Sequence, residues 1–275
     1  MIMMDEGFDY KLFKMLPFMT THTRRQFFSL AVPATMATTI GLSNASALDT
    51  GVSDVPGKRL KIIAVGAHPD DPETICGGLM ALYSGLGHEV VSVYLTRGEA
   101  GIEGKSYEEA AKIRTAEALK ACDILKVRPV FLEQIDGNCE ITSKSYTPLF
   151  DLFTKERPDI ILTHWPIDTH RDHRICSLLV YDAWLSLGRK SALYYCEAMS
   201  GTQSQHFTPT DYLDITSVIE LKHKACFAHV SQQIKETYEE HHGKMERFRG
   251  MELRCEYAES FVRHMNSPGI YLPLI

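Results

Sequence analysis

The sequence predicts an α/β protein built as a three-layer sandwich around a mostly parallel sheet. Short apolar segments rich in β-branched residues alternate along the chain with longer segments whose apolar residues recur at helical spacing. Two strands joined through a helix normally pair in parallel by a right-handed crossover. Helices should therefore cover both faces of the sheet, which is the arrangement of a Rossmann-like fold.

The elements can be taken in order from the start of this alternation. The first strand is expected over 60–65, and the helix that follows it over 73–86. A helix over 106–125 should begin at Ser106, because Glu109 stands three positions later and completes a capping box. The other strands are expected at 90–95, 130–132, 160–163, 192–197 and 212–215, and the other helices at 145–156, 173–187, 217–229, 231–240 and 252–264.

Two polar motifs directly follow strands of this predicted sheet. The first, His68-Pro-Asp-Asp, comes after the strand at 60–65, and the second, His170-x-x-His173, comes after the strand at 160–163. In an open α/β sheet, ligands bind beyond the carboxyl ends of the strands, so both motifs should lie at one edge. Carboxylates and imidazoles are costly to bury unpaired, and a divalent cation commonly offsets that cost. The sequence therefore predicts a metal site divided between two loops.

The paired motifs resemble those of the PIG-L family, also called LmbE-like proteins. These are zinc-dependent deacetylases that remove acetyl groups from N-acetylglucosamine-containing compounds. The resemblance covers most of 60–261. Five other segments also look like the family: 96–101, 114–119, 157–159, 229–232 and 257–261. The resemblance implies an LmbE-like fold and a substrate that is a small N-acetylated sugar or oligosaccharide.

The resemblance also implies a role for each motif residue. His68, Asp71 and His173 become the ligands of Zn²⁺, with Fe²⁺ or another divalent cation as an alternative. Asp70 becomes the general base, and His170 the group that stabilises or protonates the tetrahedral intermediate. Hydrolysis of an amide requires these same functions: a Lewis acid, an activated water and a proton for the departing amine.

Further residues receive weaker assignments. Substrate contacts are expected at Arg97, Glu99 and Arg114. Asp168 or Asp172 is expected to orient a ligating histidine, because carboxylates commonly lie beside metal-bound imidazoles. Pro72 separates Asp71 from Glu73, where many family members place an acidic residue directly after the Asp pair. The role of Glu73 is therefore left open. That of His229 is also open, because this histidine could reach the site or could merely satisfy a backbone carbonyl.

Two other functions stay open on the sequence alone. Two histidines and one carboxylate also describe the ligand set of non-haem iron oxygenases, although those enzymes usually sit on antiparallel β-barrels. A catalytically silent carbohydrate-binding protein could keep the same pocket, although it would need neither Asp70 nor His170. Activity in the absence of oxygen would exclude the iron oxygenase. Turnover of a substrate would exclude the catalytically silent binding protein.

The N-terminal residues predict export. Arg24 and Arg25 precede an uncharged segment over 29–47 that ends in Ala-Ser-Ala, the order of a twin-arginine signal. We expect 1–47 to be this signal, with an over-extended start before about 19, followed by a linker over 48–58 and one deacetylase domain over 59–275. The twin-arginine export machinery is therefore a predicted partner. The predicted location is the periplasm or the medium. The uncharged segment is too short and polar to span a bilayer stably.

Composition excludes some classes of protein. The net charge of −6 disfavours a nucleic acid partner. Gly66-Ala67-His68 lacks the glycine pattern of a dinucleotide-binding loop. The seven cysteines are scattered without zinc-ligand spacing, and we expect several, such as Cys122, Cys176 and Cys196, to be buried thiols.

Overall fold

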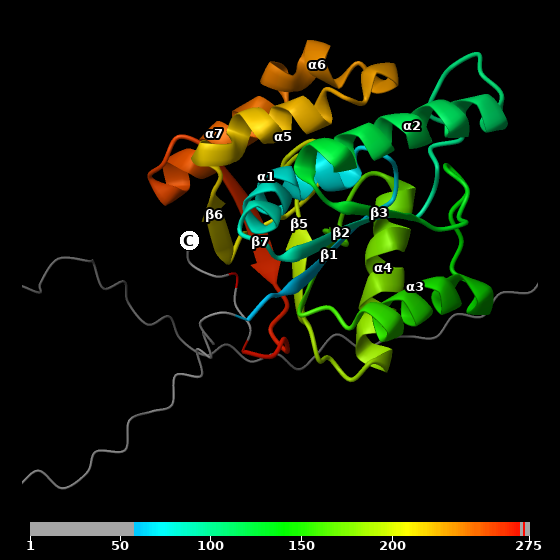
Figure 1. Cartoon of the computed structure of the whole chain (residues 1–275), viewed down its shortest axis with the longest axis horizontal. Coiled ribbons are helices and arrows are strands. Elements are labelled where there is room, and N and C mark those ends of the chain that lie inside the picture. The colour runs from blue at the N-terminus through cyan, green and yellow to red at the C-terminus, as the bar shows by residue number, and fades with distance from the viewer. Residues whose placement is uncertain (1–57, 270–271, 273–275) are drawn as a thin grey trace, which may run out of the picture. The chain divides into compact units, whose positions relative to one another are not determined.

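The computed structural model describes residues 58–269 and 272. Its centre is one seven-stranded sheet with the strand order β3-β2-β1-β4-β5-β7-β6 (Figure 1). The strands are β1 (Lys61–Gly66), β2 (Glu89–Tyr94), β3 (Arg128–Phe131), β4 (Ile160–His164), β5 (Ala192–Cys196), β6 (Asp211–Asp214) and β7 (Ala258–Arg263). The five strands from β3 to β5 are parallel to one another, and β7 pairs antiparallel with both β5 and β6. The predicted α/β fold with a mostly parallel sheet is confirmed.

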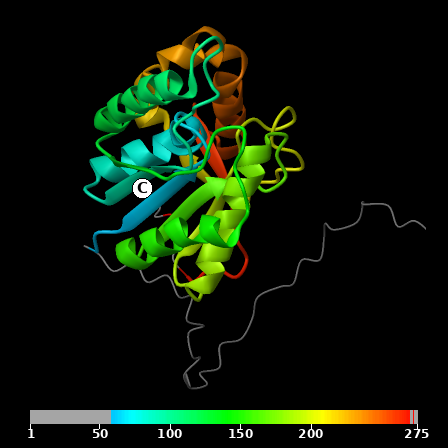
Figure 2. The ribbon, with the colours of Figure 1, turned by 90° about the vertical axis from the view of Figure 1, so that its right-hand side faces the viewer.

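Helices cover both faces of this sheet (Figures 1 and 2). The helices are α1 (Asp71–Gly85), α2 (Tyr107–Leu125), α3 (Ser143–Glu156), α4 (Arg171–Ser186), α5 (Ile219–Cys226), α6 (Ile234–Thr237) and α7 (His242–Leu253), with short 3-10 turns at Thr216–Val218, Val230–Gln232 and Tyr238–Glu240. Alternate residues of β1 enter two cores: Ile62 packs with apolar residues of α1, α2 and α5, and Ile63 with those of α3 and α4. This period of two is what a strand buried on both faces requires.

Local signals account for most helix boundaries. Ser106 accepts a hydrogen bond from the Glu109 backbone and Glu109 returns one, so the predicted capping box at the start of α2 is confirmed. At α1, Pro72 occupies the first turn, where a missing N–H costs nothing. None of the helices in the described part of the chain combines the length and apolar character needed to cross a bilayer.

The prediction was wrong in the C-terminal third. The helix expected at 252–264 does not form: α7 ends at Leu253, Arg254 adopts a left-handed conformation with φ 68°, and the chain continues into β7. A strand wins here because 258–263 can pair with β5 and β6 on either side, a long-range contact that outweighs local propensity. The helices expected at 217–229 and 231–240 are likewise reduced to α5, α6 and the turns between them.

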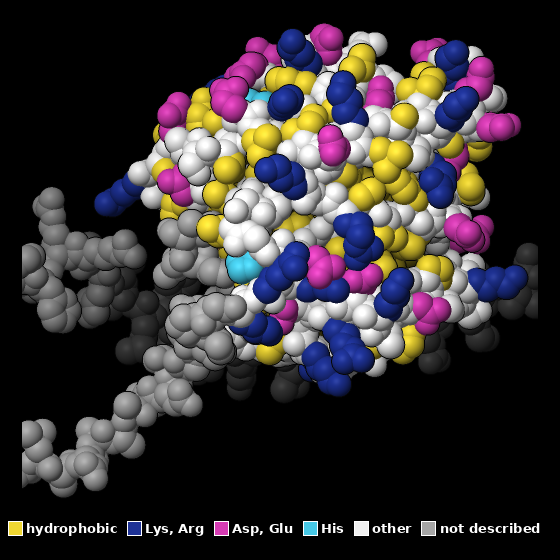
Figure 3. Space-filling view, viewed as in Figure 1, with side chains coloured by type: hydrophobic (Ala, Val, Ile, Leu, Met, Phe, Trp, Pro, Cys, Tyr) yellow, Lys and Arg dark blue, Asp and Glu magenta, His cyan; other side chains and the backbone are white. Residues whose placement is uncertain are grey.

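The surface carries charges of both signs. On the face seen in Figure 3, basic and acidic side chains are interspersed, and apolar side chains lie among them. Apolar atoms contribute a large share of the surface of an ordinary folded protein. The predictions for the export signal and the linker before residue 58 lie outside the described residues.

Candidate metal centre

The two predicted motifs meet at the carboxyl edge of the sheet. β1 and β4 are neighbours, and the strand order reverses between them, since β2 and β3 lie on one side and β5 on the other. Such a reversal opens a crevice in which ligands of α/β proteins bind. His68 follows β1 and His173 lies in the first turn of α4, so the two loops bring their side chains to this crevice.

Asp71 is the point at which the two motifs touch. Its Oδ2 accepts a hydrogen bond of 2.7 Å from the His68 backbone N–H and lies 3.2 Å from His68 Nδ1. Its Oδ1 lies 3.3 Å from His173 Nε2. Tetrahedral Zn²⁺ with bonds near 2.0–2.1 Å separates neighbouring ligand atoms by about 3.4 Å. The predicted ligands His68, Asp71 and His173 are therefore buried together, with each histidine at about this distance from one of the two oxygens of Asp71.

His164 is a fourth member of this cluster that sequence reasoning missed. It is the last residue of β4, and its Nε2 accepts a hydrogen bond from the Ala67 N–H and lies 3.2 Å from Asp71 Oδ2. Its ring stacks on His173 at a centroid distance of 3.8 Å. Burial, reinforced by His173, lowers the pKa of His164 to about 4, so the imidazole is neutral. A histidine at the end of a largely apolar strand, shortly before the second motif, was the signal available.

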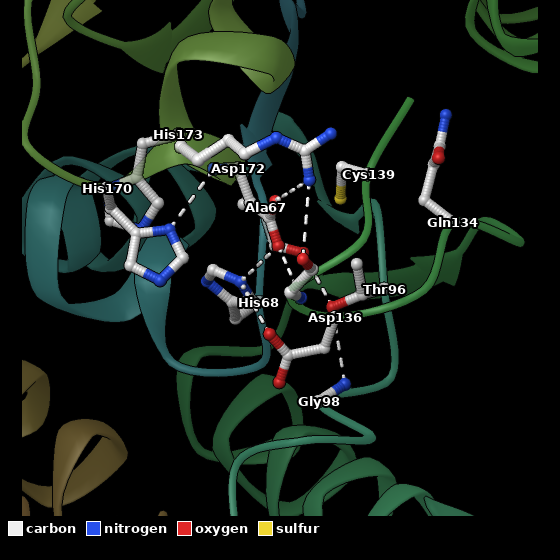
Figure 4. A network of polar contacts seen from close by, with 12 residues as sticks. Ala67, His68, Thr96, Gly98, Gln134, Asp136, Cys139, His170, Asp172 and His173 are labelled. Carbon is white, nitrogen blue, oxygen red and sulfur yellow. Dashed lines mark hydrogen bonds and ion pairs between the residues drawn. The ribbon is translucent and has the colours of Figure 1, made fainter. Parts of the chain in front are cut away.

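Carboxylates hold the far side of His68 (Figure 4). Its Nε2 lies 3.1 Å from Asp136 Oδ1 and 3.4 Å from Asp172 Oδ2. Asp172 is fully buried and also accepts the Gly137 N–H at 2.7 Å. The structure thus places Asp172 where a residue that orients a histidine should lie. It adds Asp136, which lies in a loop after β3 and belongs to no motif that the sequence analysis identified.

Asp168 lies beside the other histidine. Its Oδ1 is 3.5 Å from His173 Nδ1 and accepts the His170 N–H at 2.7 Å. Gln203 Nε2 lies 3.0 Å from the same His173 nitrogen. The ring of His173 is therefore held from behind while its Nε2 faces Asp71.

Three overlapping groups of side chains could each hold a cation. Within each group the ligand atoms lie within 4.8 Å of one another: His68, His170 and His173; Asp71, His164 and His173; His68, Asp136 and Asp172. The predicted ligands are divided between the first two groups, which share His173. Imidazole nitrogen and carboxylate oxygen are the donors that suit Zn²⁺ and Fe²⁺ alike, so the residues present fit a divalent cation.

Asp70 stands next to these residues in a strained conformation. Its φ is 112°, a value that a residue other than glycine seldom adopts. Arg114 of α2 holds this turn by donating hydrogen bonds of 2.6 Å to the Pro69 carbonyl and 3.2 Å to Asp70 Oδ2. Burial raises the pKa of the Asp70 carboxyl, although Arg114 opposes the shift. Strain of this kind is concentrated at functional sites.

His170 occupies the solvent side of the cluster. It is exposed, and its ring lies edge-on to His68 at a centroid distance of 4.8 Å. As the N-cap of α4, its Nδ1 accepts the Asp172 N–H at 3.2 Å. Its other ring nitrogen can therefore face an incoming molecule.

The three residues predicted to contact substrate occupy different environments. Arg97 is exposed, with its guanidinium 5.0 Å from the centre of the Phe131 ring. Glu99 is buried and accepts the backbone N–H groups of Arg97 and Asp136. Arg114 is also buried, and its bonds are made within the protein. Substrate contact stays a prediction for all three, and only Arg97 reaches solvent freely.

Glu73 and His229, whose roles the sequence left open, face each other. Both are fully buried, and His229 Nε2 lies 3.5 Å from Glu73 Oε2. Tyr94 donates a 2.5 Å hydrogen bond to the other oxygen of Glu73. Although burial opposes it, the carboxylates of Glu73 and Asp70 raise the pKa of His229.

Comparison with known proteins gives a consistent result. The PIG-L family, described as GlcNAc-PI de-N-acetylase, matches residues 63–184. A diacetylchitobiose deacetylase of Thermococcus kodakarensis is 28% identical over 82% of this chain and 90% of that protein. The chain is thus related to the PIG-L deacetylases.

Solved structures show the same relationship. The N,N'-diacetylchitobiose deacetylase of Pyrococcus horikoshii superposes with a TM-score of 0.67 at 27% identity, covering 78% of this chain and 86% of that one. The protein TT1542 of Thermus thermophilus gives 0.65 at 26% identity, covering 78% and 97%. A 4-carboxy-2-hydroxymuconate hydratase of Pseudomonas putida, at 22% identity and a TM-score of 0.67 over 78% and 100%, shares the fold.

Proposed function

We propose that this relative of the PIG-L deacetylases is a metal-dependent hydrolase that removes the N-acetyl group from an amino sugar or a short N-acetylated oligosaccharide. The observation that carries the proposal is a separate carboxylate, Asp70, beside a buried cluster of histidines and Asp71. A cation-binding protein needs only the cluster. A hydrolase needs, in addition, a base that is not consumed as a ligand.

His68, Asp71 and His173 would hold the cation, with Zn²⁺ as the expected ion and Fe²⁺ as the alternative. When bound, such an ion supplies a Lewis acid for the amide carbonyl and lowers the pKa of bound water to about 7. His164 would lie beside this ligand set, with its Nε2 3.2 Å from Asp71 Oδ2, and Asp136 and Asp172 would orient His68. The chain therefore supplies both the ligands and the groups that fix their direction.

Asp70 would take the proton from the attacking water. Arg114 holds its carboxylate through a 3.2 Å hydrogen bond to Oδ2, whereas the carboxylate of Asp71 contacts the histidines. Burial raises the pKa of Asp70 and so makes it a stronger base than an exposed aspartate. His170, on the solvent side, would stabilise the tetrahedral intermediate, or protonate it with the proton that Asp70 has taken from the water.

The substrate class rests on the relatives, two of which carry the name diacetylchitobiose deacetylase. Their names apply to this chain only as part of the proposal, because a hydratase shares the fold and fold alone does not fix the reaction. We include export to the periplasm through the twin-arginine machinery in the proposal, on the basis of Arg24, Arg25 and the uncharged segment that follows.

Acetate release tests the proposal directly. The purified protein should release acetate from N-acetylglucosamine or N,N'-diacetylchitobiose with added Zn²⁺, without oxygen, and should lose this activity to a chelator. Asp70→Asn should lower kcat by about 10²- to 10⁴-fold while metal content stays unchanged. Unaltered turnover by that variant would refute Asp70 as the base. A requirement for oxygen would favour an iron oxygenase, although the mostly parallel sheet differs from the barrels on which those enzymes usually occur.

A further inference from the structure

A short segment far from both motifs in the sequence contacts three elements of the candidate centre. The segment runs over 229–232, where the chain turns between α5 and α6. His229, Ser231 and Gln232 each contact a different element: α1, α2 and the loop over 97–104. The metal cluster uses none of these three residues, so the segment needs an explanation of its own.

The first contact ties the segment to α2. Ser231 donates two hydrogen bonds to Glu117, 2.8 Å from its backbone N–H and 2.6 Å from its hydroxyl. Glu117 stands three positions after Arg114, and residues three apart lie on the same face of a helix. The segment is therefore bound to the face of α2 from which Arg114 reaches Asp70.

The second contact ties the segment to the glycine loop. Gln232 Nε2 donates a 3.0 Å hydrogen bond to the Gly101 carbonyl. A Cβ atom at Gly101 would lie 2.1 Å from Arg114 Nη1, and one at Gly98 would lie 2.5 Å from Arg114 Cδ. The backbone of this loop therefore packs directly on the Arg114 side chain, and a shift of the loop would shift the guanidinium.

The third contact ties the segment to α1. His229 Nε2 lies 3.5 Å from Glu73 Oε2, and neither atom has a hydrogen-bond partner in the described part of the chain. Buried polar groups without other partners hold each other in place, since separating them would leave both unsatisfied. Glu73 lies in the first turn of α1, two residues beyond Asp71.

We propose that His229, Ser231 and Gln232 form a positioning clamp that fixes Arg114 and thereby aims the carboxylate of Asp70. The inference rests on the proposed function for the meaning of Asp70, and its geometry is independent of any cation. Asp70 keeps a φ of 112°. A strained conformation persists only where the surroundings impose it. Arg114 imposes it through Pro69 and Asp70, and the clamp joins the three elements that surround Arg114.

Hydrogen exchange tests the clamp without any assumption about activity. In Ser231→Ala/Gln232→Met, backbone amides over 66–74 and 97–104 should exchange about tenfold faster than in the unaltered protein, because local opening becomes easier. Ser231→Thr keeps the hydroxyl and should exchange as the unaltered protein does. Ser84→Ala is the matched control: Ser84 also joins α1 to α2, through a 2.6 Å bond to the Leu125 carbonyl at the far end of the helices.

Kinetics supply the second measurement. In the double variant, kcat for acetate release should fall about 10- to 100-fold while KM stays within about threefold and metal content is unchanged, since a misplaced base slows the chemical step. Ser231→Thr and Ser84→Ala should keep kcat within about twofold.

The outcomes separate the clamp from the proposed function. Unchanged exchange over 66–74 and 97–104 would overturn the clamp, as would an equal loss of kcat in Ser84→Ala, which would show general destabilisation. If the unaltered protein releases no acetate from either sugar, the deacetylase proposal fails. Faster exchange confined to the two segments in the double variant would still support the clamp.

Discussion

Two buried polar clusters in this protein differ in whether the chain supplies the cation. Beneath α7, Lys222 Nζ lies 2.8 Å from Glu246 Oε1 and 2.8 Å from Glu259 Oε1, and all three side chains are buried. At the candidate metal centre, carboxylates such as Asp71 and Asp172 converge on the imidazole of His68, and Arg114 lies to one side, with its Nη1 3.6 Å from Asp136 Oδ2.

The two clusters therefore differ in what they can bind. In the Lys222 cluster one ammonium lies between two carboxylates, and each carboxylate has further partners. Glu246 accepts the Tyr238 hydroxyl, and Glu259 accepts the backbone N–H groups of Gly78 and Leu79, which caps α1 beyond its irregular residue Cys76. At the metal centre, four carboxylates (Asp70, Asp71, Asp136 and Asp172) stand against two contacting arginines, Arg114 and Arg171, so an added cation is the natural complement.

Removing a metal ligand should have the largest effect. Asp71→Ala deletes the carboxylate that contacts His68, His164 and His173, so we expect loss of bound metal and a fall in kcat/KM of about 10⁴-fold or more. Elemental analysis measures the bound metal, and acetate release measures kcat/KM. Full metal content in this variant would show that another of the overlapping groups holds the ion.

Removing the built-in cation should act on stability instead. Lys222→Met leaves Glu246 and Glu259 buried without their partner, which should cost about 3–5 kcal/mol of unfolding free energy. Urea unfolding measures it. The matched control is Lys244→Met, whose pair with Glu240 is exposed to solvent and should leave the unfolding free energy almost unchanged. Equal losses in both variants would contradict the contrast between the clusters.

Acid should weaken the Lys222 cluster. Although burial opposes it, Lys222 lowers the pKa of Glu246 to about 2, from an ordinary value of 4.5. A carboxyl with a lowered folded-state pKa contributes stability that is complete above the ordinary value and is lost as the pH falls toward the lowered one. Between pH 6 and pH 2 the unfolding free energy of the unaltered protein should therefore fall by about 3 kcal/mol more than that of Glu246→Gln. Urea unfolding with chelator at both pH values measures the two losses, and equal losses in the two proteins would refute the prediction.

The smallest effect concerns the carboxylate behind His68. Asp136→Asn keeps the size of the side chain but removes the charge that lies 3.1 Å from His68 Nε2. Metal affinity should fall about 10- to 100-fold, as for other carboxylates that orient ligating histidines. Titration with Zn²⁺ against a competing chelator measures this, with the exposed Asp151→Asn as control. An unchanged affinity would leave Asp172 as the residue that orients His68.

Local signals predicted much of the fold and the positions of the motifs. The apolar run of β1, the capping box at Ser106 and the order of the two motifs each depend on neighbours in the chain, and each could be interpreted without a structure. His164 and Asp136 could not be assigned, because a single histidine or aspartate carries no spacing. Only the pairing of β1 with β4, and the path of the loop after β3, bring them to His68 and Asp71.

The alternation of strands and helices, and the polar motif that follows each of two strands, could be predicted from the sequence alone, because side-chain periodicity and capping are local properties. The tertiary structure decided that 258–263 is a strand, that Arg114 is buried against Asp70, and that the segment over 229–232 reaches three elements at once. These outcomes depend on contacts between residues far apart in the chain. Their energies arise only when the elements pack, so no local pattern encodes them.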